Sequence, residues 1–592
     1  MERMREALAH RGPDGEGLWR DPAGRAVLGH RRLAVLDLSP RAAQPMHDAE
    51  GRVLVYNGEI YGFRRLRREL EAAGRAFHSR GDTEVVLAAL ARWGEEALER
   101  LDGMFALALW EPEGRLLLAR DRLGIKPLFW AEIPGGLVFA SELPALLAHP
   151  GVGRRMDREA LCRWLRLGYV PGRRTLLAGV RRLEPGTVLA AAPGRIRVRR
   201  WYDPLRAVSR RGPASRAEAE EALEEVVGRA VRERLVADVP LGSFLSSGVD
   251  STLVTAFAAA EAPLETLTVR FAGGEDESAT ARRTAALLGA EPRVEVLDGD
   301  AMLEGLAVWP EVAGDPFADP SLAPTMLVSA AARRRWTVAL SGDGGDELFS
   351  GYPRLRAMPW LERLPGSLRS VARRAPLPPR RWAVKLREAL AGERDEAVYA
   401  TLQGVVPPGM VRDLMGEEGL PDPWPRELVE RVRDLPPGTR WRALDLLTFL
   451  PERVLAKVDR ASMSRSLEVR VPLLDHRVVE TVLSLPPGLC AGKSLLRGVL
   501  RRRWPQIRLP RRKVGFEVPL AAWLRGPLRR PLERALLDGG LEGIGLHPEP
   551  ARRALETHLS GRADLAEPLF ALWLLVSWAA RFRVGCMGPA VS

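Results

Sequence analysis

The sequence has 592 residues, too many for a single hydrophobic core, so two or three domains are expected. With 46% hydrophobic and 28% charged residues, it has the composition of a soluble globular protein. The net charge is +13, but only five of the 89 basic residues are lysines, and the arginines are scattered among 76 acidic residues. This pattern argues against a dedicated phosphate-binding face, so we expect no nucleic-acid partner.

The cysteine and apolar patterns exclude further classes. Cys162, Cys490 and Cys586 lie far apart, which excludes a disulfide framework and a zinc cluster. The first residues are charged and lack the apolar core of a secretory signal. The longest apolar run, 568–580, is shorter than a bilayer span and predicts a buried C-terminal helix. We therefore expect a cytoplasmic protein without a membrane partner.

The N-terminal part combines short apolar runs with helical patterns. Met4 and Leu8 indicate a short amphipathic helix that ends at the turn Gly12–Gly15. The nearly continuous apolar runs between 27 and 140 indicate a sheet covered on both faces, in a layered α+β domain. Helices are predicted at 63–74 and 83–101, a β-hairpin at 104–120, and a further β-rich segment at 183–204.

The second half has a different pattern of apolar segments. The polar stretch 205–221, which contains Gly and Pro, is interpreted as a linker. Apolar strands then alternate with helices, which predicts a parallel α/β sheet, and from about 355 the chain is mainly helical. The predicted strand–helix pairs are 239–245 with 251–261, 264–271 with 277–289, and 336–340 with 346–352.

Two loops follow predicted strands and carry the residues of a nucleotide site. The loop "FLSSGVDST" (244–252) has small residues whose backbone amides could surround a phosphate at a helix N-terminus, without the lysine of a Walker A loop. The carboxylate of Asp250 would repel phosphate unless Mg²⁺ lies between them. The loop "VALSGDGGDELFSGY" (338–352) adds Asp343, Asp346 and Glu347. Each loop alone could be an ordinary strand–turn–helix corner, but the two together favour a nucleotide and Mg²⁺.

Asn57-Gly58 follows an apolar strand and could simply be a two-residue hairpin turn. Asn57 is, however, the single asparagine of the chain. A turn would accept Asp-Gly equally well, so the carboxamide itself is interpreted as functional. A side-chain amide beside a glycine backbone amide could form an oxyanion hole.

The motifs, taken in order, resemble a known family. "RGPDGEG", "GHRRLAVLD", "AAQPM", "YNGEIY", "GDTE", "LDGMFALALW" and "ARDRLGIKPLF" resemble the glutaminase domain of class II glutamine amidotransferases. With "FLSSGVDS", "LSGDGGDELFSGY", "LEVRVPLLDH" and "KVGFEVPL", the chain resembles glutamine-hydrolysing asparagine synthetases from about residue 3 to 580. The resemblance implies an N-terminal αββα sandwich of the Ntn type in 1–204. It also implies an α/β ATP-pyrophosphatase domain, with a parallel sheet and a helical C-terminal part, in 205–592.

The resemblance also implies the roles of individual residues. In the glutamine pocket, Arg32 would hold the α-carboxylate with help from the backbone at Leu36. Asn57 and Gly58 would form the oxyanion hole, and Glu59 and Asp82 would hold the α-amino group. Residues of the nucleotide site would contact pyrophosphate (Ser246, Ser247, Gly248, Asp250, Ser251), adenosine (Leu245, Val269, Ser341, Gly342) and Mg²⁺ (Asp250, Asp346).

The implied chemistry is amide formation through an acyl-adenylate. ATP would activate the carboxylate of aspartate with release of pyrophosphate, and ammonia from glutamine would then displace AMP. Lys513 matches the family lysine that stabilises the adenylate electrostatically. ATP and Mg²⁺ are the expected cofactors, and aspartate, glutamine and ATP are the expected small-molecule partners, with a homodimer left open as the assembly.

Two positions depart from the family pattern. Ser247 replaces a glycine of the phosphate loop; if that position needed a positive φ, it would cost about 1 kcal/mol, although the hydroxyl could add a phosphate contact. The family nucleophile is a cysteine at the mature N-terminus, whereas Glu2 follows Met1 here. The resemblance therefore leads us to expect a missing first strand and a short segment upstream of Met1.

Several alternatives stay open at this point. One is an ammonia-only synthetase, and another is a related ligase that acts on a peptide, antibiotic or polysaccharide precursor. An arginine-rich binding protein and a tRNA-thiolating enzyme are further alternatives. The last is disfavoured because no cysteine lies near the motifs.

Overall fold

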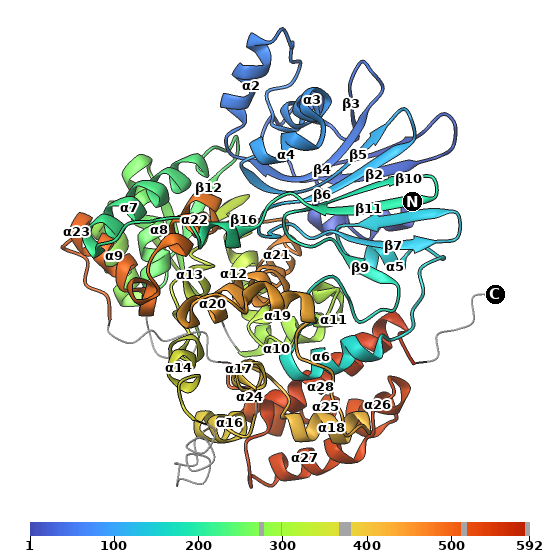
Figure 1. Ribbon diagram of the computed structural model, residues 1–592, viewed down its shortest axis with the longest axis vertical. Helices are drawn as coiled ribbons and strands as arrows, with labels where there is room; N and C mark the ends of the chain where they lie inside the picture. Colours follow the sequence, from blue (N-terminus) through green and yellow to red (C-terminus); the bar gives the residue numbers. More distant parts are fainter. Residues whose placement is uncertain (272–277, 298, 366–380, 393, 511–517, 587–592) are drawn as a thin grey trace.

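The computed structural model describes residues 1–271, 278–297, 299–365, 381–392, 394–510 and 518–586. Figure 1 shows an upper part rich in strands, built from the N-terminal third of the chain, above a mainly helical body. The last helices of the chain lie at the bottom of this view.

The N-terminal part contains a six-stranded antiparallel sheet with the order β11-β10-β6-β5-β4-β3. The second layer consists of the pair β1-β2 and the three-stranded sheet β8-β7-β9. The strands are β1 (Gly15–Arg20), β2 (Val27–Arg32), β3 (Met46–His47), β4 (Val53–Ile60), β5 (Gly103–Glu111), β6 (Arg115–Arg120), β7 (Phe129–Ile133), β8 (Gly136–Ala140), β9 (Val180–Arg182), β10 (Thr187–Ala192) and β11 (Arg195–Arg200). The helices are α1 (Glu2–Glu6), α2 (Phe63–Ala72), α3 (Thr83–Trp93), α4 (Ala97–Arg100), α5 (Leu143–Leu147) and α6 (Arg158–Leu167).

Alternating side chains of the six-stranded sheet supply two separate cores. One face packs on α2 and α3 through residues such as Leu107 and Val86. The other face packs on the second layer, where Val55 and Leu118 meet Leu28 and Trp130. Helices α1 and α5 cover the far side of that layer. The order helix, sheet, sheet, helix confirms the predicted αββα sandwich.

Local predictions in this part can be compared with the strands. The predicted hairpin is confirmed, because β5 and β6 pair antiparallel across the "EPEG" turn. The hairpin-turn alternative for Asn57-Gly58 is wrong, because both residues lie inside β4 and pair with Ala106 and Phe105 of β5. The linker prediction is wrong at its C-terminal end: Ser215 caps α7 (Arg216–Glu233) in a capping box with Glu218, so the helix begins inside the predicted linker.

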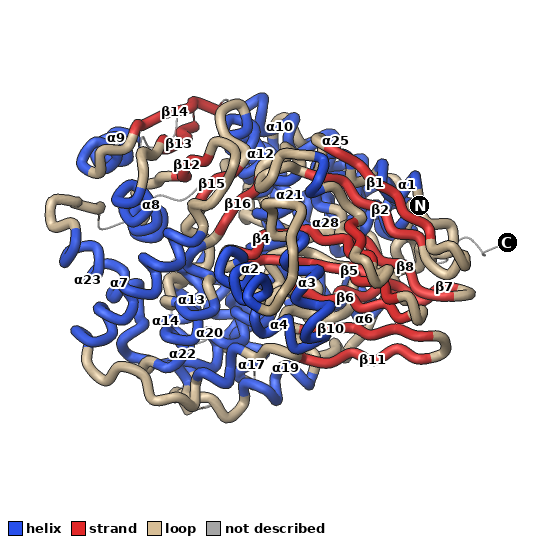
Figure 2. Tube along the Cα trace, turned by 90° about the horizontal axis from the view of Figure 1, so that it is seen from above, coloured by secondary structure: helices blue, strands red, loops and turns tan. Residues whose placement is uncertain are grey.

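The second part is built on a five-stranded parallel sheet with the order β14-β13-β12-β15-β16. Its strands are β12 (Leu241–Phe244), β13 (Glu265–Phe271), β14 (Glu291–Leu297), β15 (Val338–Leu340) and β16 (Glu468–Arg470). The chain order reverses between β12 and β15, which is where open α/β sheets bind ligands beyond the carboxyl ends of their strands. Figure 2 shows α7 and α8 on one side of these strands and α10 and α12 on the other. The predicted parallel α/β sheet is therefore confirmed.

Helices make up most of the remainder, as predicted. Helix α28 (Ala566–Phe582) contains the apolar run 568–580 and is buried along most of its length. Within the described ranges, no helix is long and apolar enough to cross a membrane. The other helices are α8 (Val249–Glu261), α9 (Ser278–Leu287), α10 (Gly299–Ala307), α11 (Trp309–Ala313), α12 (Leu322–Arg333), α13 (Gly345–Leu348), α14 (Pro353–Leu361), α16 (Arg381–Ala389), α17 (Asp395–Gln403), α18 (Pro408–Met415), α19 (Arg426–Val432), α20 (Pro437–Leu447), α21 (Ala456–Met463), α22 (His476–Ser484), α23 (Ser494–Arg503), α24 (Leu520–Arg525), α25 (Arg529–Leu537), α26 (Gly540–Gly543) and α27 (Glu549–Leu559).

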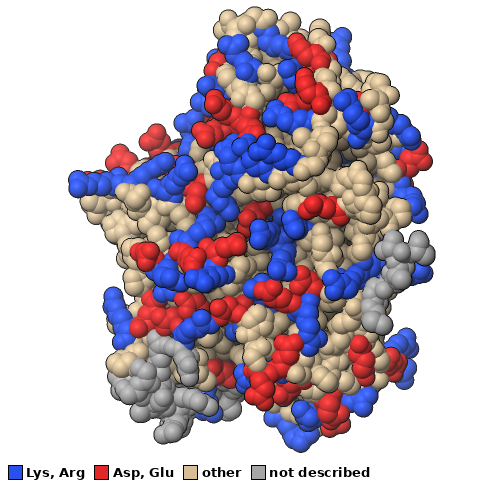
Figure 3. Space-filling view, turned by 45° about the vertical axis from the view of Figure 1, so that its right-hand side comes forward, with Lys and Arg blue, Asp and Glu red and all other residues tan. Residues whose placement is uncertain are grey.

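Buried ion pairs join the two parts. The guanidinium of Arg11 donates to Glu142 at 2.6 Å and to Asp459 of α21 at 2.8 Å. The ammonium of Lys126 lies 3.6 Å from the same Asp459 carboxylate. All four side chains are at most 5% exposed, so the N-terminal segment is fixed against a helix of the second part. On the face shown in Figure 3, by contrast, basic and acidic side chains are interspersed over the surface.

Candidate active sites

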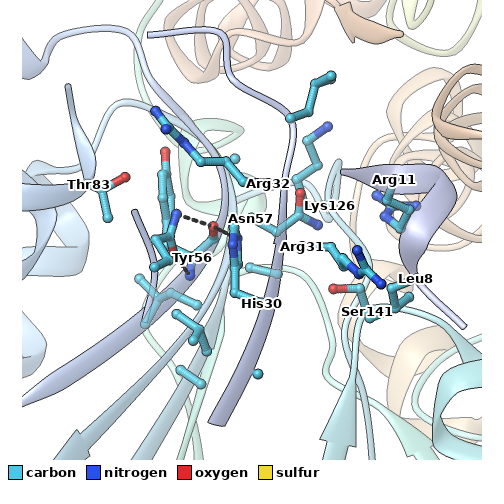
Figure 4. A pocket seen from close by; sticks show the side chains of 18 of the residues that line it. Leu8, Arg11, His30, Arg31, Arg32, Tyr56, Asn57, Thr83, Lys126 and Ser141 are labelled. Atoms are coloured by element: carbon cyan, nitrogen blue, oxygen red, sulfur yellow. Dashed lines mark hydrogen bonds between the residues drawn. The ribbon is translucent and has the colours of Figure 1, made fainter. Parts of the chain in front are cut away.

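A cavity of about 150 Å³ lies in the N-terminal part. All residues predicted to bind glutamine line it: Arg32, Leu36, Asn57, Gly58, Glu59 and Asp82. Figure 4 shows Arg32 and Thr83 on one side of this cavity, Lys126 and Arg11 on the other, and Asn57 between them. The wall also includes Met463 and Glu468 from the second part of the chain. The fold thus brings together residues that span most of the sequence.

The side-chain amide nitrogen of Asn57 has no partner in the part of the chain that the structure describes. Its Nδ2 atom is buried and makes no hydrogen bond there. An unpaired buried donor normally costs stability, so its position on a cavity wall indicates a ligand acceptor. Gly58 is required by packing: a Cβ atom at this position would lie 2.0 Å from the carbonyl oxygen of Met104. The arrangement can therefore present an amide donor to a negatively charged oxygen.

Two buried carboxylates form another side of the cavity. Asp82 accepts hydrogen bonds from the hydroxyl of Tyr56 at 2.7 Å and from the backbone amide of Ile60 at 2.9 Å. Burial raises the pKa of Asp82 to about 6, and these two hydrogen bonds oppose that shift. Burial, followed by the charges of Asp82 and Glu468, raises the pKa of Glu59 well above its usual value. This acidic surface is suited to an ammonium group.

Arg32 is close to its predicted backbone partner. Its guanidinium donates to the carbonyl oxygens of Leu36 at 3.1 Å and Ser39 at 3.2 Å, and also to that of Asp37. Arg32 is at the end of β2, and these carbonyls belong to the loop that follows it. The loop therefore holds the guanidinium at the cavity wall.

Strand β16 connects this cavity to the parallel sheet. The guanidinium of Arg470 donates to Glu468 at 2.8 Å and lies 3.7 Å from the carboxylate of Glu59. It also donates to the carbonyls of Arg234 and Val236, and its side chain is completely buried. The backbone carbonyl of the same residue accepts a hydrogen bond from the amide of Ser341 at 2.9 Å. One residue thus contacts both predicted sites.

The first nucleotide loop lies between β12 and α8. Its hydroxyls bond to one another: Ser246 Oγ is 2.9 Å from Ser251 Oγ and accepts from the amide of Gly248 at 3.1 Å. The helix starts at Val249, with Gly248 as its N-cap in an extended conformation. The loop therefore meets a helix N-terminus, where backbone amides can surround a phosphate.

Ser247 is accommodated without backbone strain. The structure gives it no positive φ, so the glycine of the family pattern is not required for conformational reasons. The residue is buried, and its hydroxyl has no hydrogen-bond partner among the described residues. The hydroxyl is therefore available for the expected phosphate contact.

The residues predicted to contact adenosine lie on neighbouring strand ends. Leu245 follows β12, and its amide donates to the carbonyl of Leu267 in β13, the strand that also carries Val269. Ser341 and Gly342 follow β15. A Cβ atom on Gly342 would lie 2.6 Å from the amide nitrogen of Ser251, so the two nucleotide loops are in close contact.

The carboxylates predicted to hold Mg²⁺ converge on one ammonium group. The Nζ atom of Lys493 lies 2.5 Å from Asp250 Oδ2 and 2.5 Å from Asp346 Oδ1. Two carboxylates suit Mg²⁺, which usually combines one or two of them with substrate phosphates and water. The described residues contain no group of three or more His, Cys, Asp or Glu side chains that could hold a metal without such help. Lys513 lies outside the described residues.

Three residues that contribute to these sites were not predicted from the sequence: Lys493, Glu468 and Arg470. Lys493 carried a usable signal, because it is one of only five lysines in the chain. Glu468 and Arg470 lie in the motif "LEVRVPLLDH", but a strand of three residues has no readable periodicity.

Comparisons with known proteins identify the family of each part of the chain. The asparagine synthase family model matches residues 222–580, and the glutamine amidotransferase domain model matches residues 1–202. A Mycobacterium tuberculosis protein, provisionally named a glutamine-hydrolyzing asparagine synthetase, is 33% identical; the match covers 100% of this chain and 95% of that protein. Asparagine synthetase [glutamine-hydrolyzing] 1 of Bacillus subtilis is 30% identical, with 98% and 93% covered. Amidase chry2 of Gibberella zeae is 28% identical, with 92% and 88% covered.

The two sites and the family matches occur in the same order along the chain. The match to the amidotransferase model contains the six residues predicted to bind glutamine, and the match to the synthase model contains both nucleotide loops. The chain therefore belongs to the asparagine synthase family of ATP-dependent amidotransferases and ligases.

Proposed function

We propose that this chain converts aspartate to asparagine by adenylating its side-chain carboxylate. The observation that carries the proposal is the contact of the two nucleotide loops at the sheet reversal, with Asp250 and Asp346 facing one position. In the proposed reaction, the aspartate carboxylate attacks the α-phosphate of ATP and pyrophosphate leaves. Ammonia then attacks the acyl carbon, and AMP leaves with the former carboxylate oxygen.

The proposed roles follow the geometry of each site. The amides at Gly248 and Val249 and the hydroxyl of Ser247 would bind phosphate oxygens. Leu245, Val269, Ser341 and Gly342 would border the adenosine. Asp250 and Asp346 would hold Mg²⁺, which when bound supplies positive charge to the leaving pyrophosphate. Lys513 keeps its proposed role beside the adenylate.

The N-terminal cavity would serve the supply of nitrogen. Arg32, assisted by the backbone of Leu36, would bind the glutamine α-carboxylate, while Glu59 and Asp82 would bind its α-amino group. Asn57 and Gly58 would stabilise the oxyanion formed during hydrolysis. The described residues lining this cavity include no cysteine. We propose that ammonium or glutamine supplies the nitrogen. We also propose that residues 1–204 and 205–592 form the two units of a cytoplasmic enzyme.

The test is a nitrogen-source assay on the full chain. Aspartate, ATP and Mg²⁺ are supplied with ammonium or with glutamine, and AMP, pyrophosphate and asparagine are quantified. We expect equal amounts of all three products with ammonium, and asparagine formed from glutamine would show that the N-terminal cavity also supplies nitrogen. Formation of ADP and phosphate, or no AMP with any nitrogen source, would contradict the proposal.

A second candidate is a ligase for another carboxylate. It is favoured by the relatives named amidases, which match this chain over most of its length. Peptides, antibiotic precursors and polysaccharide precursors with a free carboxylate, supplied in place of aspartate, test it in the same AMP assay. If one of these compounds releases AMP and aspartate does not, that compound is the acceptor instead of aspartate.

A further inference from the structure

Lys493 occupies the space between the two carboxylates assigned above to Mg²⁺. It lies in the bend between the segment Pro487–Lys493 and helix α23, and its side chain is only 9% exposed. Its backbone has φ of +60°, a left-handed conformation that is uncommon for a residue other than glycine. The backbone amide donates to the carbonyl of Phe349 at 3.1 Å, which fixes the bend against the second nucleotide loop.

The surroundings leave the ammonium little freedom. A Cβ atom on Gly351 would lie 2.5 Å from Lys493 Cε and 1.9 Å from Asp346 Oδ1, so this glycine makes room for the ion pair. A Cβ atom on Gly345 would lie 2.6 Å from the carboxyl carbon of Asp250. The charge cluster is therefore closely packed, and its parts come from three separate segments of the chain.

The physical role of this ammonium follows from its charge. Two carboxylates held together in a partly buried site repel one another, and a cation between them relieves that repulsion. A divalent metal ion could supply that charge, but the lysine already occupies the position between the two oxygens. The compact, flexible ammonium of lysine can also leave that position, whereas an arginine would form a fixed planar contact.

We propose that Lys493 is the resident cation of the nucleotide site. While no nucleotide is bound, it neutralises Asp250 and Asp346 and keeps free divalent ions out. When the nucleotide enters with its metal ion, the ammonium moves to the phosphate oxygens and the metal takes over the carboxylates. Metal binding then depends on nucleotide. This inference rests on the proposed function, because it requires Asp250 and Asp346 to be the metal carboxylates.

The test measures Mn²⁺ binding to the full chain by electron paramagnetic resonance of the free ion. Without nucleotide, we expect the wild type to bind Mn²⁺ weakly at this site and Lys493→Met to bind it about tenfold more tightly or better. With a non-hydrolysable ATP analogue, we expect the wild type to bind Mn²⁺ tightly, and Lys493→Met to bind the analogue more weakly. Lys385→Met removes a lysine paired with Glu567, away from both nucleotide loops, and should behave as the wild type.

The outcomes separate this inference from the proposed function. Equal Mn²⁺ affinity of the wild type and Lys493→Met without nucleotide would overturn the role of Lys493. Tight Mn²⁺ binding to the nucleotide-free wild type, abolished by Asp250→Asn, would overturn it even if Lys493→Met failed to fold. No binding of the Mn²⁺–analogue complex to the wild type would instead overturn the proposed function.

Discussion

Replacing Arg470 by methionine tests whether one buried guanidinium supports both sites. The substitution keeps a long side chain but removes the cation beside Glu59 and Glu468 and the donors to two backbone carbonyls. Removing one partner of a buried ion pair typically costs about 3–5 kcal/mol, because the remaining charge is left without compensation. At neutral pH we expect a loss of this size in the free energy of unfolding.

The loss should depend on pH in a defined direction. Burial and neighbouring carboxylates already raise the pKa of Glu59, while Arg470 opposes that shift. Without Arg470, the pKa of Glu59 rises further, so the folded variant binds more protons than the unfolded chain. Stability then falls as pH rises, by up to about 1.4 kcal/mol per pH unit for each additional proton. The difference from the wild type should therefore be smaller at pH 5 than at pH 8.

Urea unfolding at pH 5, 6, 7 and 8 measures this difference. Arg502→Met is the matched control, because Arg502 pairs with Glu224 at the surface and is 41% exposed. Its loss should stay within about 1 kcal/mol. An equal loss at pH 5 and pH 8, or a loss no larger than that of the control, would refute the reasoning.

Three further outcomes are expected. Gly58→Ala should lower the free energy of unfolding by about 1–3 kcal/mol in urea titrations, because its Cβ would lie 2.0 Å from the Met104 carbonyl oxygen. Gly153→Ala, at an exposed position with open space around it, should leave the free energy of unfolding unchanged. Glutamine affinity measured by calorimetry should rise between pH 5 and pH 7, because the Asp82 carboxyl, with a pKa of about 6, loses its proton there. A flat profile, or a rise that survives Asp82→Asn, would contradict this assignment. Ser247→Ala should weaken binding of an ATP analogue about two- to tenfold. The melting temperature should stay unchanged, since the hydroxyl has no protein partner among the described residues. Unchanged affinity would argue against the phosphate contact.

Features with a local signal could be predicted from the sequence. The hairpin β5–β6 is marked by two apolar runs around a turn, and the strands that precede the two loops are marked by apolar residues followed by glycines. The signal that would have corrected the linker prediction is also local. The pair Ser215 and Glu218 has the spacing of a capping box, which would have placed the start of α7 correctly.

Features that depend on distant contacts could not be predicted in this way. The ion pair between Lys493 and Asp250 joins residues far apart in the chain, and so does the approach of Arg470 to Glu59. Neither leaves a periodic pattern, because each partner is a single polar residue in a buried segment. Such contacts follow from the packing of the two parts and become visible only in three dimensions.

Strand β16 has a consequence for any attempt to divide this protein. It is an edge strand of the parallel sheet, yet Glu468 lines the cavity of the other part and Arg470 approaches Glu59. A fragment cut between residues 204 and 205 would lose part of its cavity wall together with Arg470, whose guanidinium lies 3.7 Å from Glu59. The glutamine cavity is therefore a joint product of both halves, and neither half can be engineered or exchanged with a relative without refitting the other.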